Sequence, residues 1–251
     1  MYDRGRGRLF RLPRCAIISG CYITRWAPWQ DGYEKREEMS LILKDRFHPS
    51  QRQKLQEKID KGQITICDEL SLLEQEQLRP LASFSLLLLV IGAILFVVLT
   101  FAVLLGRTQS LNFEFSAIKV IIWVVINIVS YILILPVHEA IHALAFLLWG
   151  GRPYFGAKLP LALYCGARNQ LFRRAHYLVV GLAPLVVITL AGIILTLLAP
   201  ILASYVIFAT IGNIAGAAGD LWVAIRLWRQ PGAWFIEDTA TGYRAWQMES
   251  V

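Results

Sequence analysis

The feature that most constrains this chain is a series of long apolar runs that begins at Pro80. Runs of about 18 or more apolar residues with few charges are typical of membrane-spanning helices, because a helix satisfies its backbone polar groups internally. Four such runs lie at roughly 83–106, 118–149, 177–199 and 204–228. We therefore expect an all-α membrane protein with about four transmembrane helices and a small N-terminal region in water.

The polar start of the chain predicts two regions. Residues 1–79 are expected to form a cytoplasmic N-terminal region, and residues 80–251 the transmembrane domain. Residues 1–38 are rich in Arg and aromatic residues without clear periodicity, so we expect a mobile arm, or an extension before a start at Met39. Short helices are predicted over 50–62 and over 68–79, the second ended by the proline that follows it.

The distribution of basic residues predicts the orientation. The formal net charge is +7, and all Lys and Arg except Arg107 and Lys119 lie in residues 1–79, in the loop 150–175 or from Arg226 onward. The positive-inside rule places these segments in the cytoplasm. We predict a multi-pass protein of the cell (plasma) membrane with both termini cytoplasmic. Its basic residues are assigned to the membrane surface of the lipid bilayer and not to nucleic acid.

The second apolar run carries the strongest chemical signal, the sequence PVHEAIHAL. His138 and His142 are four residues apart, so on a helix they share one face, and Glu139 lies close to the same edge. In this HExxH pattern two histidines can bind one Zn²⁺ while the glutamate acts on water as a base. The alternative is a set of satisfied polar residues packed between helices. The cost of placing three ionisable groups in a membrane helix favours the metal site.

A third ligand is expected, because catalytic zinc usually has three protein ligands. Between residues 120 and 225 the only acidic residues are Glu139 and Asp220. The helix offsets place Asp220 at the level of the two histidines, and the glycines before it would allow close approach of the helices. Alternatively, Asp220 pairs with Arg226 or Asn213. The third ligand would then be Glu237, Asp238 or His176.

These residues resemble those of a known class of enzymes. HEAIH in a spanning helix, with a late Asp after the Gly-rich stretch NIAGAAGDL, resembles the intramembrane zinc proteases of the site-2 protease type. The pattern is more similar still to bacterial four-helix membrane proteins described as zincin peptidases. The resemblance covers roughly 115–230 and implies that His138, His142 and Asp220 are the zinc ligands and that Glu139 is the general base. The stretch lacks the Pro and the Asp-Gly pair of site-2 proteases.

The leading hypothesis is a zinc-dependent, membrane-embedded peptidase of the HExxH metalloprotease type. Its substrates would be membrane proteins or membrane-proximal peptides. A non-catalytic scaffold or transporter-like protein with a relic metal site is the alternative, and a zinc hydrolase acting on lipid would use the same ligands. Asn213 is assigned either to a helix–helix hydrogen bond or to a substrate carbonyl, and His176 to the membrane interface. Residues 153–165 form either a strand edge for an extended peptide or an interfacial loop. The cysteines form no CxxC pair and are expected to be free thiols.

Overall fold

The computed structural model describes residues 41–107, 116–158, 162–230, 235–239 and 241–249. The expectations for residues 1–38 and for Met39 lie outside these ranges. By its contacts, Glu38–Val251 forms one compact unit, and the description below concerns that unit.

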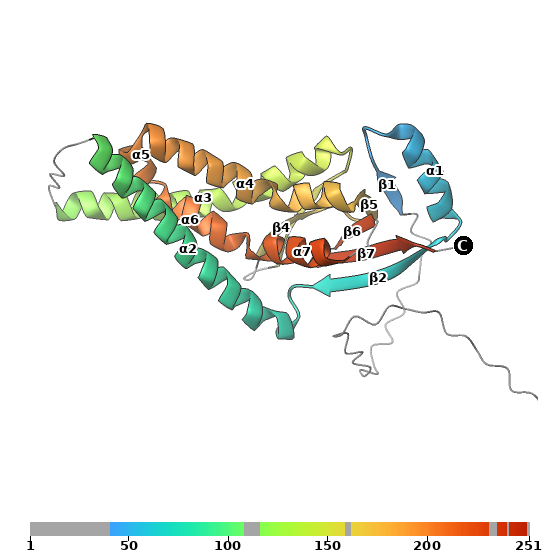
Figure 1. The fold of residues 1–251 in the computed structure, drawn as a ribbon. Coiled ribbons are helices and arrows are strands. Elements are labelled where there is room, and N and C mark those ends of the chain that lie inside the picture. Colours follow the sequence, from blue (N-terminus) through green and yellow to red (C-terminus); the bar gives the residue numbers. More distant parts are fainter. Residues whose placement is uncertain (1–40, 108–115, 159–161, 231–234, 240, 250–251) are drawn as a thin grey trace, which may run out of the picture. The chain divides into compact units, whose positions relative to one another are not determined.

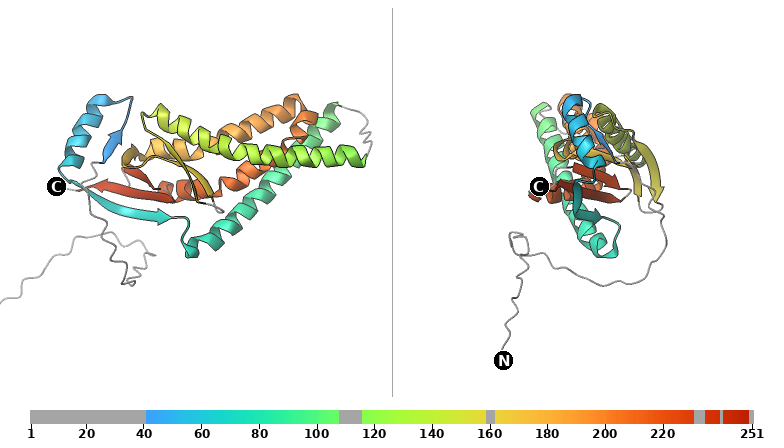
Figure 2. Two further views of the ribbon diagram at one scale, coloured as in Figure 1. Left: turned by 180° about the vertical axis from the view of Figure 1, so that it is seen from behind. Right: turned by 90° about the vertical axis from the view of Figure 1, so that its right-hand side faces the viewer.

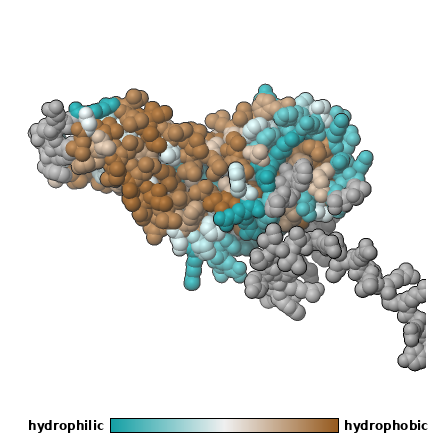
Figure 3. Space-filling model, in the orientation of Figure 1, coloured by the Kyte–Doolittle hydropathy of each residue, from teal (hydrophilic) through white to brown (hydrophobic). Residues whose placement is uncertain are grey.

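Long apolar helices make up most of this unit (Figure 1). Helix α2 covers Gln75–Arg107, α3 covers Ala117–Leu148 and α4 covers Arg174–Leu198. The fourth span comprises α6, Ile207–Gly216, and α7, Ala218–Arg229, after the short helix α5, Pro200–Ser204. In the described part of the chain, four helices are long and apolar enough to cross a membrane. This confirms the predicted number of spans, and Figure 3 shows the apolar surface that covers them.

The fourth span is interrupted close to a predicted site residue. Helix α6 ends at Gly216 and α7 begins at Ala218, so the sequence expectation of one continuous helix over 204–228 is replaced by two helices. Gly212, Gly216 and Gly219 lie around this point, and glycine costs about 1 kcal/mol in a helix interior relative to alanine. The interruption places Asp220 in the first turn of α7.

A β-sheet lies at one end of the helices and joins segments from both halves of the chain (Figure 1). Its strands are β1 (Ile42–Lys44), β2 (Ile64–Ser71), β5 (Gln170–Arg173), β6 (Phe235–Thr239) and β7 (Gly242–Met248). Their order is β1-β5-β6-β7-β2; β1 runs parallel to β5, and the other pairs are antiparallel. The N-terminal strands therefore share one sheet with the C-terminal hairpin. The chain is mainly helical, as predicted, but it also contains strands that the all-α expectation did not include.

A separate hairpin lies between α3 and α4 in sequence. Strands β3, Tyr154–Lys158, and β4, Ala162–Gly166, pair antiparallel, and β4 contacts α3. Figure 2, seen from behind, shows this hairpin crossing beside the end of α3. Of the two predictions for residues 153–165, the structure therefore contains the strand pair and not an irregular loop.

The N-terminal segment confirms one helix prediction and contradicts another. Helix α1 covers Pro49–Asp60, close to the predicted 50–62, and Gly62 adopts a left-handed φ of 70° after it. The predicted helix over 68–79 is wrong. Residues up to Ser71 belong to β2, whose partner strand β7 lies about 175 residues further along the chain and leaves no local signal. Helix α2 begins only at Gln75 and continues through Pro80, so the proline does not end a helix here.

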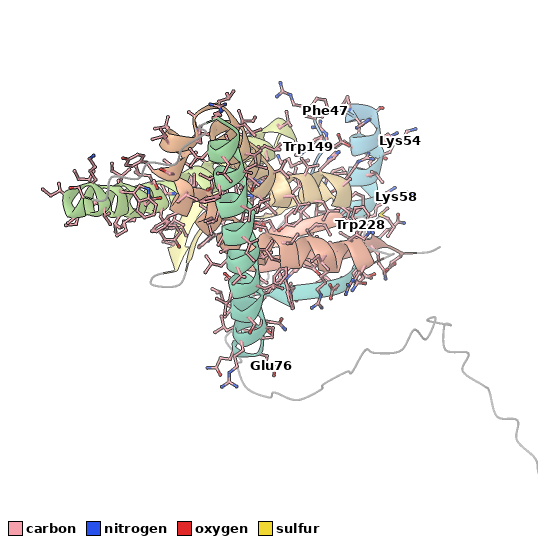
Figure 4. All side chains as sticks on the ribbon, turned by 60° about the vertical axis from the view of Figure 1, so that its left-hand side comes forward. Phe47, Lys54, Lys58, Glu76, Trp149 and Trp228 are labelled. Atoms are coloured by element: carbon pink, nitrogen blue, oxygen red, sulfur yellow. The ribbon has the colours of Figure 1, made fainter. Side chains whose placement is uncertain are left out.

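The main apolar core lies where the helix ends meet the sheet. Phe146 of α3, Phe172 of β5, Leu227 of α7 and Tyr243 of β7 are all almost fully buried in one cluster. Beside it, Trp149 packs edge-on against Phe47 with ring centroids 5.4 Å apart, and both side chains are visible in Figure 4. Phe146 of α3 also contacts Tyr177 of α4 with ring centroids 6.4 Å apart, so aromatic contacts join the ends of these two helices. The candidate site lies one to two helical turns from this cluster.

Candidate metal centre

His138, His142 and Asp220 meet between α3 and α7. Nε2 of His138 lies 3.1 Å from Oδ2 of Asp220, and Nε2 of His142 lies 3.5 Å from the same oxygen. The two Nε2 atoms are 3.2 Å apart. Three ligand atoms at these separations could hold one metal ion between them. Asp220 therefore lies where the helix offsets placed it.

The triangle of ligand atoms fits the coordination geometry of zinc. Zinc–nitrogen and zinc–oxygen distances of about 2.0–2.1 Å with tetrahedral angles require ligand atoms about 3.3 Å apart. The three observed separations of 3.1, 3.2 and 3.5 Å bracket this value. Two histidines and one carboxylate are also a known donor set for catalytic zinc, which leaves a position for water or substrate. The residues present therefore fit a zinc ion.

Each imidazole is held by a hydrogen bond on its other nitrogen. Nδ1 of His138 lies 2.9 Å from Oδ1 of Asn213 on α6. Nδ1 of His142 lies 2.9 Å from the backbone carbonyl of Val180 on α4. Both acceptors require a proton on Nδ1, so the lone pair of each ring is on Nε2 and faces Asp220. Such partners orient the ligands of metal sites and raise their basicity.

Glu139 lies in the same cavity as the three ligand candidates. The cavity has a volume of about 470 Å³, and His138, Glu139, His142 and Asp220 all line it. Cys165 of β4 lines the same cavity beside Glu139. Glu139 is not one of the three groups that converge as ligands. It is therefore available for proton transfer at the wall of the cavity.

The family comparison agrees with this geometry. Residues 131–234 match the model of a family described as "Putative zincin peptidase". The matched segment includes all four site residues, so the predicted resemblance to this family is confirmed over residues 131–234, and the match indicates a metallopeptidase in general terms. The predicted relation to site-2 proteases stays a prediction. Neither the curated proteins nor the solved structures contain a significant match to the chain.

The structure assigns other partners to the alternative site residues. Arg226 forms an ion pair with Asp68 and does not bind Asp220. His176 stacks on Trp149 with ring centroids 3.8 Å apart. Asn213 bonds an imidazole, so of its two predicted roles the structure contains the helix–helix hydrogen bond. The fallback ligand Glu237 accepts a hydrogen bond from Trp246.

Asp238, the last fallback ligand, lines the cavity without joining the metal ligands. Its carboxylate accepts hydrogen bonds from the Tyr177 hydroxyl at 2.7 Å and from the Ala167 amide at 2.9 Å. Burial raises the pKa of Asp238 to about 7, although both hydrogen bonds favour the charged form. Asp238 lies beyond the segment that matches the zincin family, and its partners come from distant elements. The sequence offered Asp238 only as an alternative zinc ligand, a role that the structure gives to Asp220 instead as the third converging group.

Cys165 completes the wall of the cavity beside Glu139. Its thiol is free, as predicted, and burial with the nearby charges of Glu139 and Asp238 raises its pKa to about 12. A thiol in that state is protonated at neutral pH and is a poor nucleophile, and Cys165 is not one of the three groups that converge as ligands. Cys67 is also a free thiol, while Cys15 and Cys21 lie outside the described residues.

Proposed function

We propose that the protein is a zinc-dependent, membrane-embedded peptidase that hydrolyses peptide bonds of membrane or membrane-proximal substrates. The observation that carries the proposal is the triangle of two imidazole nitrogens and one carboxylate oxygen, with Glu139 beside it in the same cavity. His138, His142 and Asp220 would hold the ion. Zinc bound there would supply a Lewis acid that acidifies water and polarises a carbonyl oxygen.

Glu139 performs the proton transfers of the reaction. Its carboxylate accepts a proton from the attacking water and delivers that proton to the leaving amide nitrogen. The carbon–nitrogen bond breaks, the water oxygen stays on the new carboxyl group, and the nitrogen leaves as an amine. The Nδ1 partners of the histidines keep both rings oriented.

The lining of the cavity supports a peptide from a membrane protein as substrate. Leu78 and Leu81 of α2 and Leu163 of β4 form an apolar wall, which suits apolar side chains. Strand β4 pairs with β3 along one edge, and three consecutive residues of β4 line the cavity. An extended peptide bound beside β4 would have its backbone next to Glu139.

Metal analysis with matched variants tests the metal site. We expect about one zinc per chain in the detergent-purified protein and a large loss in His142→Ala, because two remaining ligands hold zinc poorly. His176→Ala is the matched control, since His176 is also a buried histidine but stacks on Trp149. Equal zinc content in His142→Ala and the wild type would refute the metal site.

The catalytic assignment needs a second variant. Glu139→Gln should keep zinc and lose at least about 100-fold in hydrolysis of a model membrane peptide, the scale of general base catalysis. A Glu139→Gln variant that cleaves at the wild-type rate would exclude Glu139 as the base. If the wild type binds zinc and cleaves no peptide, the non-catalytic scaffold becomes the better description.

A further inference from the structure

Pro184 lies in the middle of α4, is buried, and leaves one helix carbonyl without its usual partner. In an α-helix the amide N–H of each residue donates to the carbonyl four residues earlier. Proline has no N–H. The hydrogen bond that would run from position 184 to the carbonyl of Val180 is therefore missing. In a spanning helix such a carbonyl needs another donor, because lipid supplies none.

His142 supplies that donor. Its Nδ1 lies 2.9 Å from the Val180 carbonyl oxygen, and both residues are buried, Val180 to 2 % exposure and His142 to 7 %. The carbonyl left by the proline is thus satisfied by the imidazole, and the same bond fixes the ring with Nε2 toward Asp220. Because the proline lies four residues after Val180, the N–H that it lacks is the one that would otherwise donate to the Val180 carbonyl.

The carbonyl of Pro184 itself contacts the partner of the other histidine. Nδ2 of Asn213 donates to the Pro184 oxygen over 3.5 Å, a long hydrogen bond. This contact orients the amide so that Oδ1 faces Nδ1 of His138 at 2.9 Å. Position 184 of α4 therefore lies beside the acceptors of both imidazoles, but only the missing N–H, which affects His142, is particular to proline.

We propose that Pro184 is a positioning residue for His142 of the metal centre. It touches neither ion nor substrate, and it acts through the Val180 carbonyl. The inference rests on the proposed function, because it assigns a purpose to the orientation of ligands that the proposed zinc site needs. Loss of a hydrogen-bond partner that orients a metal-binding histidine typically lowers metal affinity 10- to 100-fold.

Pro184→Ala restores the N–H and tests the proposal. The new amide would donate to the Val180 carbonyl and compete with His142, so zinc affinity should fall about 10-fold. The thermal stability of the metal-free protein should stay equal or rise, because proline is the least favourable residue in a helix interior. Zinc affinity is measured by competition with a chelating dye, and stability by thermal unfolding in detergent. Pro80→Ala is the matched control, because it also removes a proline from inside a spanning helix, α2. It should leave zinc affinity unchanged.

Lactic acid at position 184, introduced by nonsense suppression, gives the decisive comparison. It differs from alanine only by an ester oxygen in place of the N–H, so it should keep wild-type zinc affinity. The proposal is overturned if Pro184→Ala binds zinc as tightly as the wild type, if lactic acid weakens binding as much as alanine, or if Pro184→Ala loses stability and zinc affinity together. A wild type that binds no zinc would instead refute the proposed function.

Discussion

Asp68 on β2 joins the sheet to α7, the helix that carries Asp220. The variant Asp68→Asn measures how much this contact contributes to the free energy of unfolding. The Asp68 carboxylate accepts two hydrogen bonds from Arg226 of α7, from Nε at 3.0 Å and from Nη2 at 2.7 Å, and a third from the Tyr243 hydroxyl. Burial alone would raise the pKa of Asp68, but these hydrogen bonds outweigh it and hold the pKa below its usual value. The carboxylate is therefore charged at neutral pH, and asparagine would remove that charge.

The geometry gives an approximate cost for this change. A hydrogen bond to a charged group contributes about 1.5–3 kcal/mol, and the single oxygen of asparagine, placed at Oδ2, can still accept two of the three. The Asp68 side chain is 11 % exposed and that of Arg226 is 38 % exposed, so water recovers part of the loss. We expect Asp68→Asn to lower the free energy of unfolding by about 2 kcal/mol. That corresponds to a fall of about 4–8 °C in the unfolding temperature.

The neighbouring residue offers a matched control. Glu69, also on β2, pairs with Arg244 of β7 at 2.9 Å, but the two side chains are 54 % and 43 % exposed. Glu69→Gln should cost no more than about 0.5 kcal/mol, or at most about 2 °C, as exposed ion pairs do. Thermal unfolding of both metal-free variants in detergent at neutral pH measures the difference. Equal losses in the two variants, or no loss in Asp68→Asn, would refute the argument that burial and the two-point contact decide the strength of this pair.

Two further changes test other parts of the fold. Asn127 is fully buried in α3 and binds the carbonyl of Ser204 and the amide of Phe208. Asn127→Leu should therefore lower the free energy of unfolding by about 1–3 kcal/mol, measured as a lower unfolding temperature. An unchanged unfolding temperature would contradict this. Because the folded pKa of Asp238, about 7, exceeds its usual value, the folded state binds the extra proton, and stability should fall as pH rises from about 4 to 7. Asp238→Asn should remove this fall, so that its unfolding temperature, relative to the wild type, is higher at pH 8 than at pH 5.

The sequence alone determined the membrane helices and the ligand candidates, because both depend on local patterns. A run of apolar residues predicts a spanning helix without reference to any partner. His138 and His142 share a face through helical periodicity alone, and Asp220 could be chosen because it is the only acid in the later spans. Equal offsets along two parallel helices then placed these groups at one level, and the structure brings their ligand atoms together.

Only the tertiary structure decided the sheet and the groups that support the site. Strand β2 pairs with β7 about 175 residues away, and the helical prediction over 68–79 failed because strand pairing depends on such distant partners. The Val180 carbonyl that accepts the hydrogen bond from His142 is left free by Pro184, and that proline is visible in the sequence. Which side chain takes the released carbonyl, however, depends on how α3 and α4 pack. Hydrogen bonds between separate elements have no sequence spacing, so no local pattern predicts them.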